Sequence, residues 1–286
     1  MNFVSQVPST VPASHSVTYS CTLTNRWSKA THPVLYEGIS GIAHWSPPVL
    51  VAHSNDYTLW APGTLASPGV ESVAETGSTV QLEKELQIAE DSRTAGATVI
   101  GSNQFNGSDP PQTFADIVLT PQFPLLSTIT MVAPSPDWFS GFYNVSPITG
   151  TNDSSKQAGK MVWYDSFEIE SFPWDAGTET GTTYTINNDP EPTNQPIQQI
   201  TVATVPSNNI LLDPSGTKVL PMANWKCTLV DSSCSDSDEL RFKNRKKRNC
   251  QWVGKRKTKK RCKKKWKGKS LSFFCPETCG KCVDQK

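Results

Sequence analysis

A dense run of cationic side chains near the C-terminal end carries the most evident chemistry of this sequence. Residues 226–286 hold 20 of the 27 Lys and Arg residues but only 6 of the 26 Asp and Glu residues, a net charge of +14, whereas residues 1–225 carry −13. Cationic groups packed this closely repel one another unless a polyanion neutralises them. The residues predicted to bind a polyanion are Arg245, Lys246, Lys247, Arg248, Lys255, Arg256, Lys257, Lys259, Lys260, Arg261, Lys263, Lys264 and Lys265.

Several polyanions fit this run: sulfated or carboxylated polysaccharide, an anionic mineral surface, anionic lipid, or nucleic acid. Trp252 and Trp266 are interleaved with the charges, and the string KRKTKKR would also pass for a nuclear localisation signal, which is a weak and common pattern. Because cysteines surround the run, an extracellular polysaccharide, matrix or cell-surface glycan is the more economical partner, and nucleic acid is not favoured.

The cysteines are concentrated in the same region. Seven of the eight lie between Cys227 and Cys282, and the remaining one is Cys21. Such a cluster indicates either a disulfide framework or a metal site. All four histidines lie upstream, between His15 and His53, so no Cys/His zinc pattern forms within the tail, although six thiolates could still hold zinc. A disulfide framework implies a secreted protein, yet no signal peptide is present in the sequence as given.

Enzyme chemistry is not indicated. Ser46 and Ser54 are close to His44 and His53 in sequence only, and there is no G-x-S-x-G motif, P-loop or dinucleotide fingerprint. No stretch approaches the 18 apolar residues of a transmembrane segment. We therefore expect a binding protein without catalytic activity. The sequence leaves its oligomeric state open.

Short strands must position these groups. Many short apolar runs separated by Gly, Pro, Asn, Asp and Ser predict an antiparallel β-sandwich, with one helix between about Gly69 and Asp91. The runs are 114–119, 125–133, 161–169 and 199–204, and Ala223–Val230 is expected to be the last strand. We divide the chain into a disordered segment (1–15), a sandwich (16–231) and a small cysteine-rich module (232–286), which is too short to fold on an apolar core alone.

Cys21 lies on the first strand of the predicted sandwich, and Cys227 lies on the last. Cys21 is in phase with Val17, Tyr19 and Leu23, and Cys227 is in phase with Trp225 and Leu229, so both point inward. First and last strands of a sandwich can be neighbours, and we expect a Cys21–Cys227 disulfide. The alternative is a pair of buried free thiols.

Five strings of residues carry a resemblance to a known family. They are NRWSKATHPV (25–34), AHWSPPVLVAHSNDYTLW (43–60), APSPDWFSG (133–141), FPWDAGTETG (172–181) and KVLPMANWKCTLV (218–230). They resemble the F-spondin N-terminal domain of the spondins and mindin. The resemblance implies a C2-like antiparallel sandwich, residence in the extracellular matrix or at the cell surface, one bound calcium ion (Ca2+), and binding to receptors or microbial glycolipids.

The family resemblance also suggests calcium ligands. It places Asp137 and Asp175 near the ion, and it aligns Val118 with a third carboxylate, for which Asp116, two residues away, is the expected substitute. Glu179 is a weaker candidate. The alternative interpretation is that Asp137 and Asp175 only cap turns. The five tryptophans within the family strings are expected to pack in the core, although Trp138 could be exposed beside Asp137.

The tail resembles the ShK-type module in its C-x3-C-x2-C ending preceded by three spaced cysteines. That resemblance implies the pairs Cys234–Cys282, Cys250–Cys275 and Cys262–Cys279. Sequons at Asn106 and Asn152 are the predicted glycosylation sites. The leading hypothesis is thus a secreted, calcium-binding adhesion or matrix protein with a polycationic anchor. The second is an intracellular nucleic-acid-binding protein with a zinc-binding tail.

Overall fold

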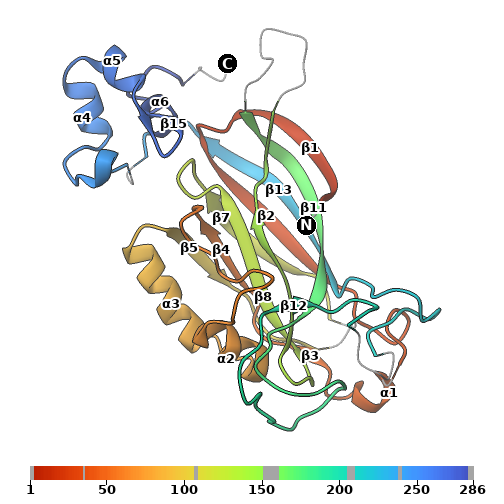
Figure 1. The fold of residues 1–286 in the computed structure, drawn as a ribbon. Coiled ribbons are helices and arrows are strands. Elements are labelled where there is room, and N and C mark those ends of the chain that lie inside the picture. The colour runs from red at the N-terminus through yellow and green to blue at the C-terminus, as the bar shows by residue number, and fades with distance from the viewer. Residues whose placement is uncertain are drawn as a thin grey trace.

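The computed structural model describes residues 3–34, 36–105, 109–150, 161–204, 210–237 and 240–282. A large β-structure holds most of the chain, and a small module at the C-terminal end lies against one end of it (Figure 1). The predicted fold class, a mainly β antiparallel sandwich with an added disulfide-rich module, is confirmed.

The sandwich consists of two antiparallel layers that share one long strand, β11 (Met161–Asp175). The strand order is β5-β4-β8-β9-β11-β13-β2-β7. The first part of β11 pairs with β13, whereas its last four residues pair with β9, and Ser171 and Phe172 mark the change of partner. The first layer contains β1 (Phe3–Pro12), β2 (Ser16–Asn25), β7 (Gln112–Leu119), β10 (Ile148–Gly150) and β13 (Ala223–Ser233).

The second layer contains β4 (Val49–His53), β5 (Ala95–Ile100), β8 (Leu125–Ala133), β9 (Trp138–Val145) and β12 (Gln198–Gln199), with β3 (His44–Trp45) and β6 (Gln104–Phe105) at its margin. Between the layers lies the main core, in which Phe142 of β9 meets Trp225 of β13 edge to face at 5.7 Å. The inward phase of Cys21 and Cys227 is confirmed, because both are fully buried in this core.

The outer face of the second layer is covered by α2 (Pro68–Thr76) and α3 (Val80–Asp91), while the short α1 (Tyr36–Ile39) packs at the opposite end from the module (Figure 1). Strand β4 is therefore buried on both faces: Val49 and Val51 face the helices, and Leu50 and Ala52 face the main core. The single helix expected over residues 69–91 is wrong. Gly77 ends α2 in the left-handed conformation with φ 70°, which breaks the helical run in two.

The N-terminal segment also differs from the expectation of disorder. Phe3–Pro12 forms strand β1, which pairs antiparallel with β11. Its residues are mostly exposed, so no apolar periodicity marks it, and it is held by the backbone ladder and by the Phe3 ring against Tyr164 and Phe167. The apolar run 199–204 is likewise not a full strand, because only Gln198–Gln199 pairs before the chain turns.

All eight cysteines are paired. Cys21 of β2 and Cys227 of β13 are register partners and form a disulfide, and the other bridges are Cys234–Cys282, Cys250–Cys275 and Cys262–Cys279. The pairs are those expected from the sequence. The three bridges of the module hold a small core around Phe242, Val253, Leu271 and Phe274. The module's elements are η2 (Phe242–Asn244), α4 (Cys250–Lys255), α5 (Thr258–Cys262), β14 (Lys265–Trp266), β15 (Lys269–Ser270) and α6 (Leu271–Phe274).

Candidate functional site

Two sets of charged residues are candidates for function, and the first is a group of carboxylates at the end of the sandwich opposite the module. Asp137 lies in the turn between β8 and β9, and Asp175 is the last residue of β11. The β9–β11 ladder pairs Asp175 with Trp138, so it holds the two acids on adjacent strand ends. The sequence strings PSPDWF and PWDAGT are therefore neighbours in space.

A tight turn after Asp175 fixes the orientation of both carboxylates. Gly177 has φ 74°, and a Cβ there would lie 2.2 Å from the carbonyl oxygen of Gln195, so only glycine fits. The backbone N–H of Gly177 donates to Asp175 Oδ1 at 2.9 Å. The next two N–H groups, of Thr178 and Glu179, donate to Asp137 Oδ2 at 2.7 and 3.2 Å.

The second oxygen of Asp137 has no protein partner. Asp137 is fully buried, and its Oδ1 accepts no hydrogen bond from the described residues. Buried polar atoms are nearly always satisfied, and an anionic one is costly to leave alone. An orphaned carboxylate oxygen on a residue whose charge acts on a second carboxylate is what a bound hard cation such as Ca2+ would satisfy.

Burial and neighbouring negative charges raise the pKa of all three acids. Burial, and then the charge of Asp137, raise the pKa of Asp175 to about 7, against the opposing effect of the Gly177 hydrogen bond. Burial raises the pKa of Glu179 to about 7, with further contributions from Glu75, Asp137 and Asp189. The pKa of Asp137 is raised by burial as well. Neutralisation by protons or by a metal ion is thus favoured here.

The four candidate calcium ligands fare differently. Asp137 and Asp175 are brought together, and Glu179 joins them as a buried residue of the same turn. Asp116 is not brought to this group: it is an exposed residue of β7, at a bulge where φ is 57°. It does share a face with Val118, but that face is exposed to solvent, and the strand that leads into Asp137 is β8.

Sequence reasoning missed Glu75 of α2, whose charge contributes to the raised pKa of Asp137 and of Glu179. No motif surrounds it, and only the packing of α2 against the sandwich brings it near. Few side-chain ligands are available to a cation here, because no three carboxylate oxygens of the described residues lie within 4.8 Å of one another at this end. A calcium ion would need backbone carbonyl oxygens beside Asp137 and Asp175.

The tryptophans near this end belong to the core. All five within the family strings are at most 4% exposed, and Trp138, which could have been a surface residue, is 1% exposed and packs against Tyr184. His53 is likewise buried, with its ring nitrogens 2.7 Å from Ser127 Oγ and 2.9 Å from the carbonyl oxygen of Ser54. This is a satisfied histidine of the sheet.

The second charged set is the basic module. Of the thirteen residues predicted to bind polyanions, all are exposed except Arg248 and Arg261, which are half-buried. Those two lie over the Trp252 ring, at 5.5 and 4.0 Å from its centre. Trp252 stacks on Phe242 at 5.7 Å between ring centres, and Trp266 meets Phe242 edge to face at 5.8 Å. The tryptophans therefore build the module's core and orient cations on its surface.

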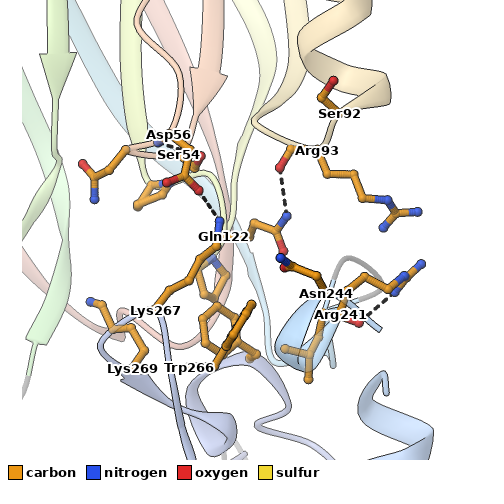
Figure 2. A pocket seen from close by; sticks show the side chains of 15 residues that line it. Ser54, Asp56, Ser92, Arg93, Gln122, Arg241, Asn244, Trp266, Lys267 and Lys269 are labelled. Carbon is orange, nitrogen blue, oxygen red and sulfur yellow. Dashed lines mark hydrogen bonds and ion pairs between the residues drawn. The ribbon is translucent and has the colours of Figure 1, made fainter. Parts of the chain in front are cut away.

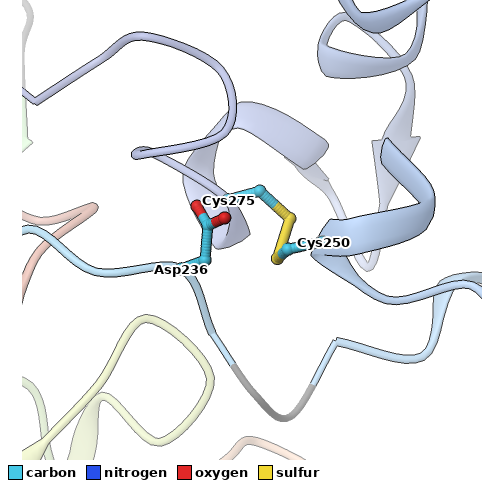
Figure 3. Close-up of side chains that lie close together, drawn as sticks. All are labelled: Asp236, Cys250 and Cys275. Atoms are coloured by element: carbon cyan, nitrogen blue, oxygen red, sulfur yellow. A yellow bond between two sulfur atoms is a disulfide. The ribbon is translucent and has the colours of Figure 1, made fainter. Parts of the chain in front are cut away.

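One further group of potential metal ligands lies in the module. Among the described residues, Asp236, Cys250 and Cys275 are the one set whose ligand atoms lie within 4.8 Å of one another (Figure 3). The two sulfur atoms are bonded to each other, and the Asp236 carboxylate accepts hydrogen bonds from the backbone and hydroxyl of Thr278. The group is a structural turn, and its cysteines supply no thiolate for zinc.

Two predicted features lie outside the description. The sequons at Asn106 and Asn152 fall on residues that the structure does not describe. Within the described residues, no helix is both long and apolar enough to cross a bilayer.

A two-layer antiparallel sandwich with its buried acids at one end and a disulfide-bonded module at the other is the architecture of a modular β-sandwich protein. Comparison with known proteins shows the family to which it belongs. The Spondin_N family model matches residues 17–221, and the chain belongs to this family.

The relatives give the same assignment. The chain is 32% identical to Spondin-1 of Rattus norvegicus over 210 residues, which is 72% of this chain and 24% of that protein. It is 32% identical to Spondin-1 of Homo sapiens over 209 residues, again 72% and 24%, and 30% identical to Spondin-2 of Rattus norvegicus over 170 residues, 59% and 48%. The match thus spans about a quarter of spondin-1 and about half of spondin-2, and the family model ends before the basic module begins.

Proposed function

We propose that this protein is a secreted adhesion or extracellular-matrix protein in which a calcium-binding spondin sandwich (16–231) is anchored to extracellular polyanions by its basic module (232–286). Spondin membership supports the secreted matrix assignment, and the four disulfides fit an oxidising compartment. We further propose that the module is ShK-like, on the basis of its first-to-sixth, second-to-fourth and third-to-fifth cysteine pairing.

One observation carries the polyanion assignment. Eleven of the thirteen predicted polyanion-binding cations are exposed, and none of the thirteen forms an ion pair with an acid within the part of the chain that the structure describes. So many unneutralised charges on a module of this size are stabilised by a bound polyanion and its release of counterions. A sulfated glycan is the expected partner. The intracellular nucleic-acid alternative is disfavoured because no cysteine is free.

The calcium assignment has separate support. A buried, orphaned Asp137 oxygen, an Asp175 carboxyl with its pKa raised to about 7 and a glycine turn that presents backbone groups to both are consistent with a site completed by Ca2+. Asp137 and Asp175 would hold the ion, and the ion would neutralise their mutual repulsion. Receptor and glycan partners of the sandwich are proposed on family grounds alone.

The test of the polyanion assignment uses matched sets of lysines in the whole chain. Replacing Lys263, Lys264 and Lys265 with Gln is expected to lower the salt concentration at which the protein elutes from immobilised heparin. It should also reduce the slope of log affinity against log salt by about 2–3, since each neutralised cation contributes roughly 0.7–0.9. The control replaces the exposed sandwich lysines Lys29, Lys84 and Lys218 with Gln. Equal losses in both variants would refute the module as the anchor.

A further inference from the structure

A pocket of about 550 Å³ lies at the end of the sandwich away from the module. Its lining residues come from the end of α2, the segment that leads into β3, the turn between β8 and β9, and the loop that follows Glu179; α2 and β3 mark this end in Figure 1. The volume is within the range of roughly 300–1,000 Å³ that is typical of small-ligand sites. Neither Asp137 nor Asp175 lines the pocket, so it is separate from the pair of acids proposed to hold calcium.

The loop that forms one wall of the pocket is closed at its base. Glu179 and Pro190 pair as an isolated antiparallel bridge at the two ends of this loop. Gly181, with φ 140°, brings the loop against the sandwich, because a Cβ there would lie 2.8 Å from the side chain of Pro136. The wall is therefore held in place without a ligand, and a preformed pocket loses less free energy in ordering when a ligand binds.

The carboxyl group of Glu179 has no partner in the pocket. Glu179 is only 6% exposed, and among the described residues no hydrogen bond or ion pair reaches its carboxylate or that of Glu75, the second acid of the wall. No lysine or arginine is among the described lining residues, and Nδ1 of His44, the remaining titratable one, lies 2.7 Å from the carbonyl oxygen of Ile42. Burial, and then the charge of Glu75, raise the pKa of Glu179, and a buried acid without a partner is costly. The pocket therefore favours a bound cation.

The rest of the wall decides which kind of cation fits. Met131, Ala133 and Pro134 are buried apolar residues of the wall, and Ile42 and Ile186 line it while being 52% and 85% exposed. A calcium ion needs a full shell of oxygen ligands, which so apolar a wall does not supply. A lysine side chain combines a hydrocarbon stem, which packs on apolar surface, with an ammonium group that donates hydrogen bonds to carboxylates.

The exposed basic run of the module is a dense source of such side chains. Of the thirteen residues assigned above to polyanion binding, eleven are exposed, and nine of those are lysines. Residues 226–286 carry +14 and residues 1–225 carry −13, which favours contact between the two parts. The contact does not form within one chain, because the pocket and the module lie at opposite ends (Figure 1), and Lys267 of the module is paired with Asp56 of the sandwich, as Figure 2 shows. A second copy of the chain can supply the lysine.

We propose that this pocket accepts a lysine side chain from the basic module of a second copy of this chain, with Glu179 and Glu75 binding its ammonium group. The pocket and the module are different surfaces, so the contact is head-to-tail and leaves one free pocket and one free module at the ends of each assembly. It uses cations that the proposed anchor also uses, so a bound polyanion competes with it.

The first experiment measures binding of N-acetyl-lysine methylamide to the full chain by NMR, with the methyl groups of Ile42 and Ile186 as reporters. The control probe is N-acetyl-norleucine methylamide, which has a similar hydrocarbon side chain and no ammonium group. We expect the lysine probe alone to shift both methyl signals, and its affinity to fall at least fivefold in Glu179→Gln and in Glu75→Gln. The matched control variant is Glu83→Gln, which changes an exposed acid of α3 outside the pocket. Equal binding of the two probes, or binding by Glu179→Gln within twofold of the unmodified protein, would overturn the lysine site.

Sedimentation velocity tests whether the partner is a second copy. The unmodified chain should self-associate, more strongly at low salt because its charges are less screened, and both Glu179→Gln and the Lys263, Lys264 and Lys265 variant should associate at least fivefold more weakly. A mixture of these two variants should form one-to-one dimers that do not grow, because one supplies an intact module and the other an intact pocket.

Two outcomes of this second experiment would overturn self-association. If the mixture forms no more dimer than either variant alone, the contact is not head-to-tail. If the unmodified chain stays monomeric at low salt although the lysine probe binds, the pocket belongs to another basic protein. Glu179→Gln should still elute from immobilised heparin at the same salt concentration as the unmodified protein, so failure of this proposal is distinguishable from failure of the proposed anchor.

Discussion

The sandwich and the module handle charge in opposite ways. The sandwich places its notable acids, Asp137, Asp175 and Glu179, in buried or half-buried positions where their pKa values rise. The module places nearly all its lysines and arginines in solvent. The buried set is small and geometrically fixed, so it suits one ion. The exposed set is large and adaptable, so it suits a long polymer.

The two parts also differ in what holds them together. The sandwich has two apolar clusters, one between its layers and one beneath α2 and α3, and a single disulfide. The module has one cluster of eight buried residues, three of which are cysteines, and three disulfides. Small domains of this kind rely on covalent links because their core is too small.

The largest predicted effect tests this difference in what stabilises the sandwich and the module. In Cys250→Ala/Cys275→Ala we expect the module to lose its fold, because the pair lies at the centre of its small core. In Cys21→Ala/Cys227→Ala the sandwich should stay folded but lose up to about 5 kcal/mol, the chain-entropy value for a separation of 206 residues. Peptide-resolved hydrogen exchange checks the first variant, and denaturant unfolding checks the second. Retained protection of residues 240–282 in the first variant would contradict the prediction.

A smaller effect is expected at the carboxylates. If Ca2+ binds the folded state alone, calcium at 100 times its dissociation constant stabilises by about 2.7 kcal/mol, or roughly 5–10 °C in Tm for a domain of this size. Asp137→Asn should abolish this rise. Asp116→Asn, which changes an exposed acid, should leave it intact. Calorimetric titration and thermal melting of chelated protein provide the measurement, and the absence of any response at millimolar calcium in the unmodified protein would exclude the site.

These acids show what a sequence pattern can and cannot predict about the candidate site. The strings around Asp137 and Asp175 predict their proximity through the family resemblance. The structure gives the physical reason, because Asp175 ends β11 and Asp137 directly precedes β9, its partner in the ladder. Asp116 fails for a geometric reason: alternation along a strand identifies which residues share a face, and it does not say which end of the sandwich, or which side, that face meets. Glu75 is beyond sequence reasoning, since only helix packing brings it near.

The fold, too, could be predicted only in part from the sequence. Strands with alternating burial, such as β2 and β13, are evident from the sequence, and their inward cysteines predict the bridge between them. Strand β1 lacks that alternation because its pairing rests on backbone hydrogen bonds, which any residue can make. The division of one expected helix into α2 and α3 depends on the left-handed Gly77, and a glycine within a helical run has that role only in some contexts.

The smallest predicted effect concerns pH, to which the buried acids of the sandwich and the exposed cations of the module should respond differently. With a pKa of about 7, the Asp175 carboxyl is half ionised at pH 7 and mostly protonated at pH 6. Protons therefore compete with Ca2+, and the affinity for Ca2+ should fall about tenfold between pH 7.5 and 6. In the calcium-free protein, folding stability depends on pH in the opposite direction. The raised pKa of Asp175 contributes stability that is fully present below about pH 4 and is lost as pH rises through 7.

The module provides the internal control for that experiment. It contains no histidine, the side chain whose ordinary pKa lies within this range. Heparin affinity at constant salt should therefore be the same at pH 6 and 7.5 while calcium affinity changes. Calorimetry of both ligands at the two pH values makes the comparison, and a calcium affinity that does not depend on pH would argue against Asp175 as a ligand.

The bridge between β2 and β13 has a mechanical consequence. Ser16 and Ser233 are paired at the same end of these strands. Tension applied to the N-terminal segment and to the module would therefore break the hydrogen bonds between the two strands one pair at a time from that end. Separation of the strands would stop at the Cys21–Cys227 disulfide, which lies a few residues from that end. Roughly 700 Å of chain, 206 residues at about 3.3–3.6 Å each, is thereby shielded from the load. A module tethered to a stretched matrix could then transmit force past the sandwich without unravelling the loops that hold its acids.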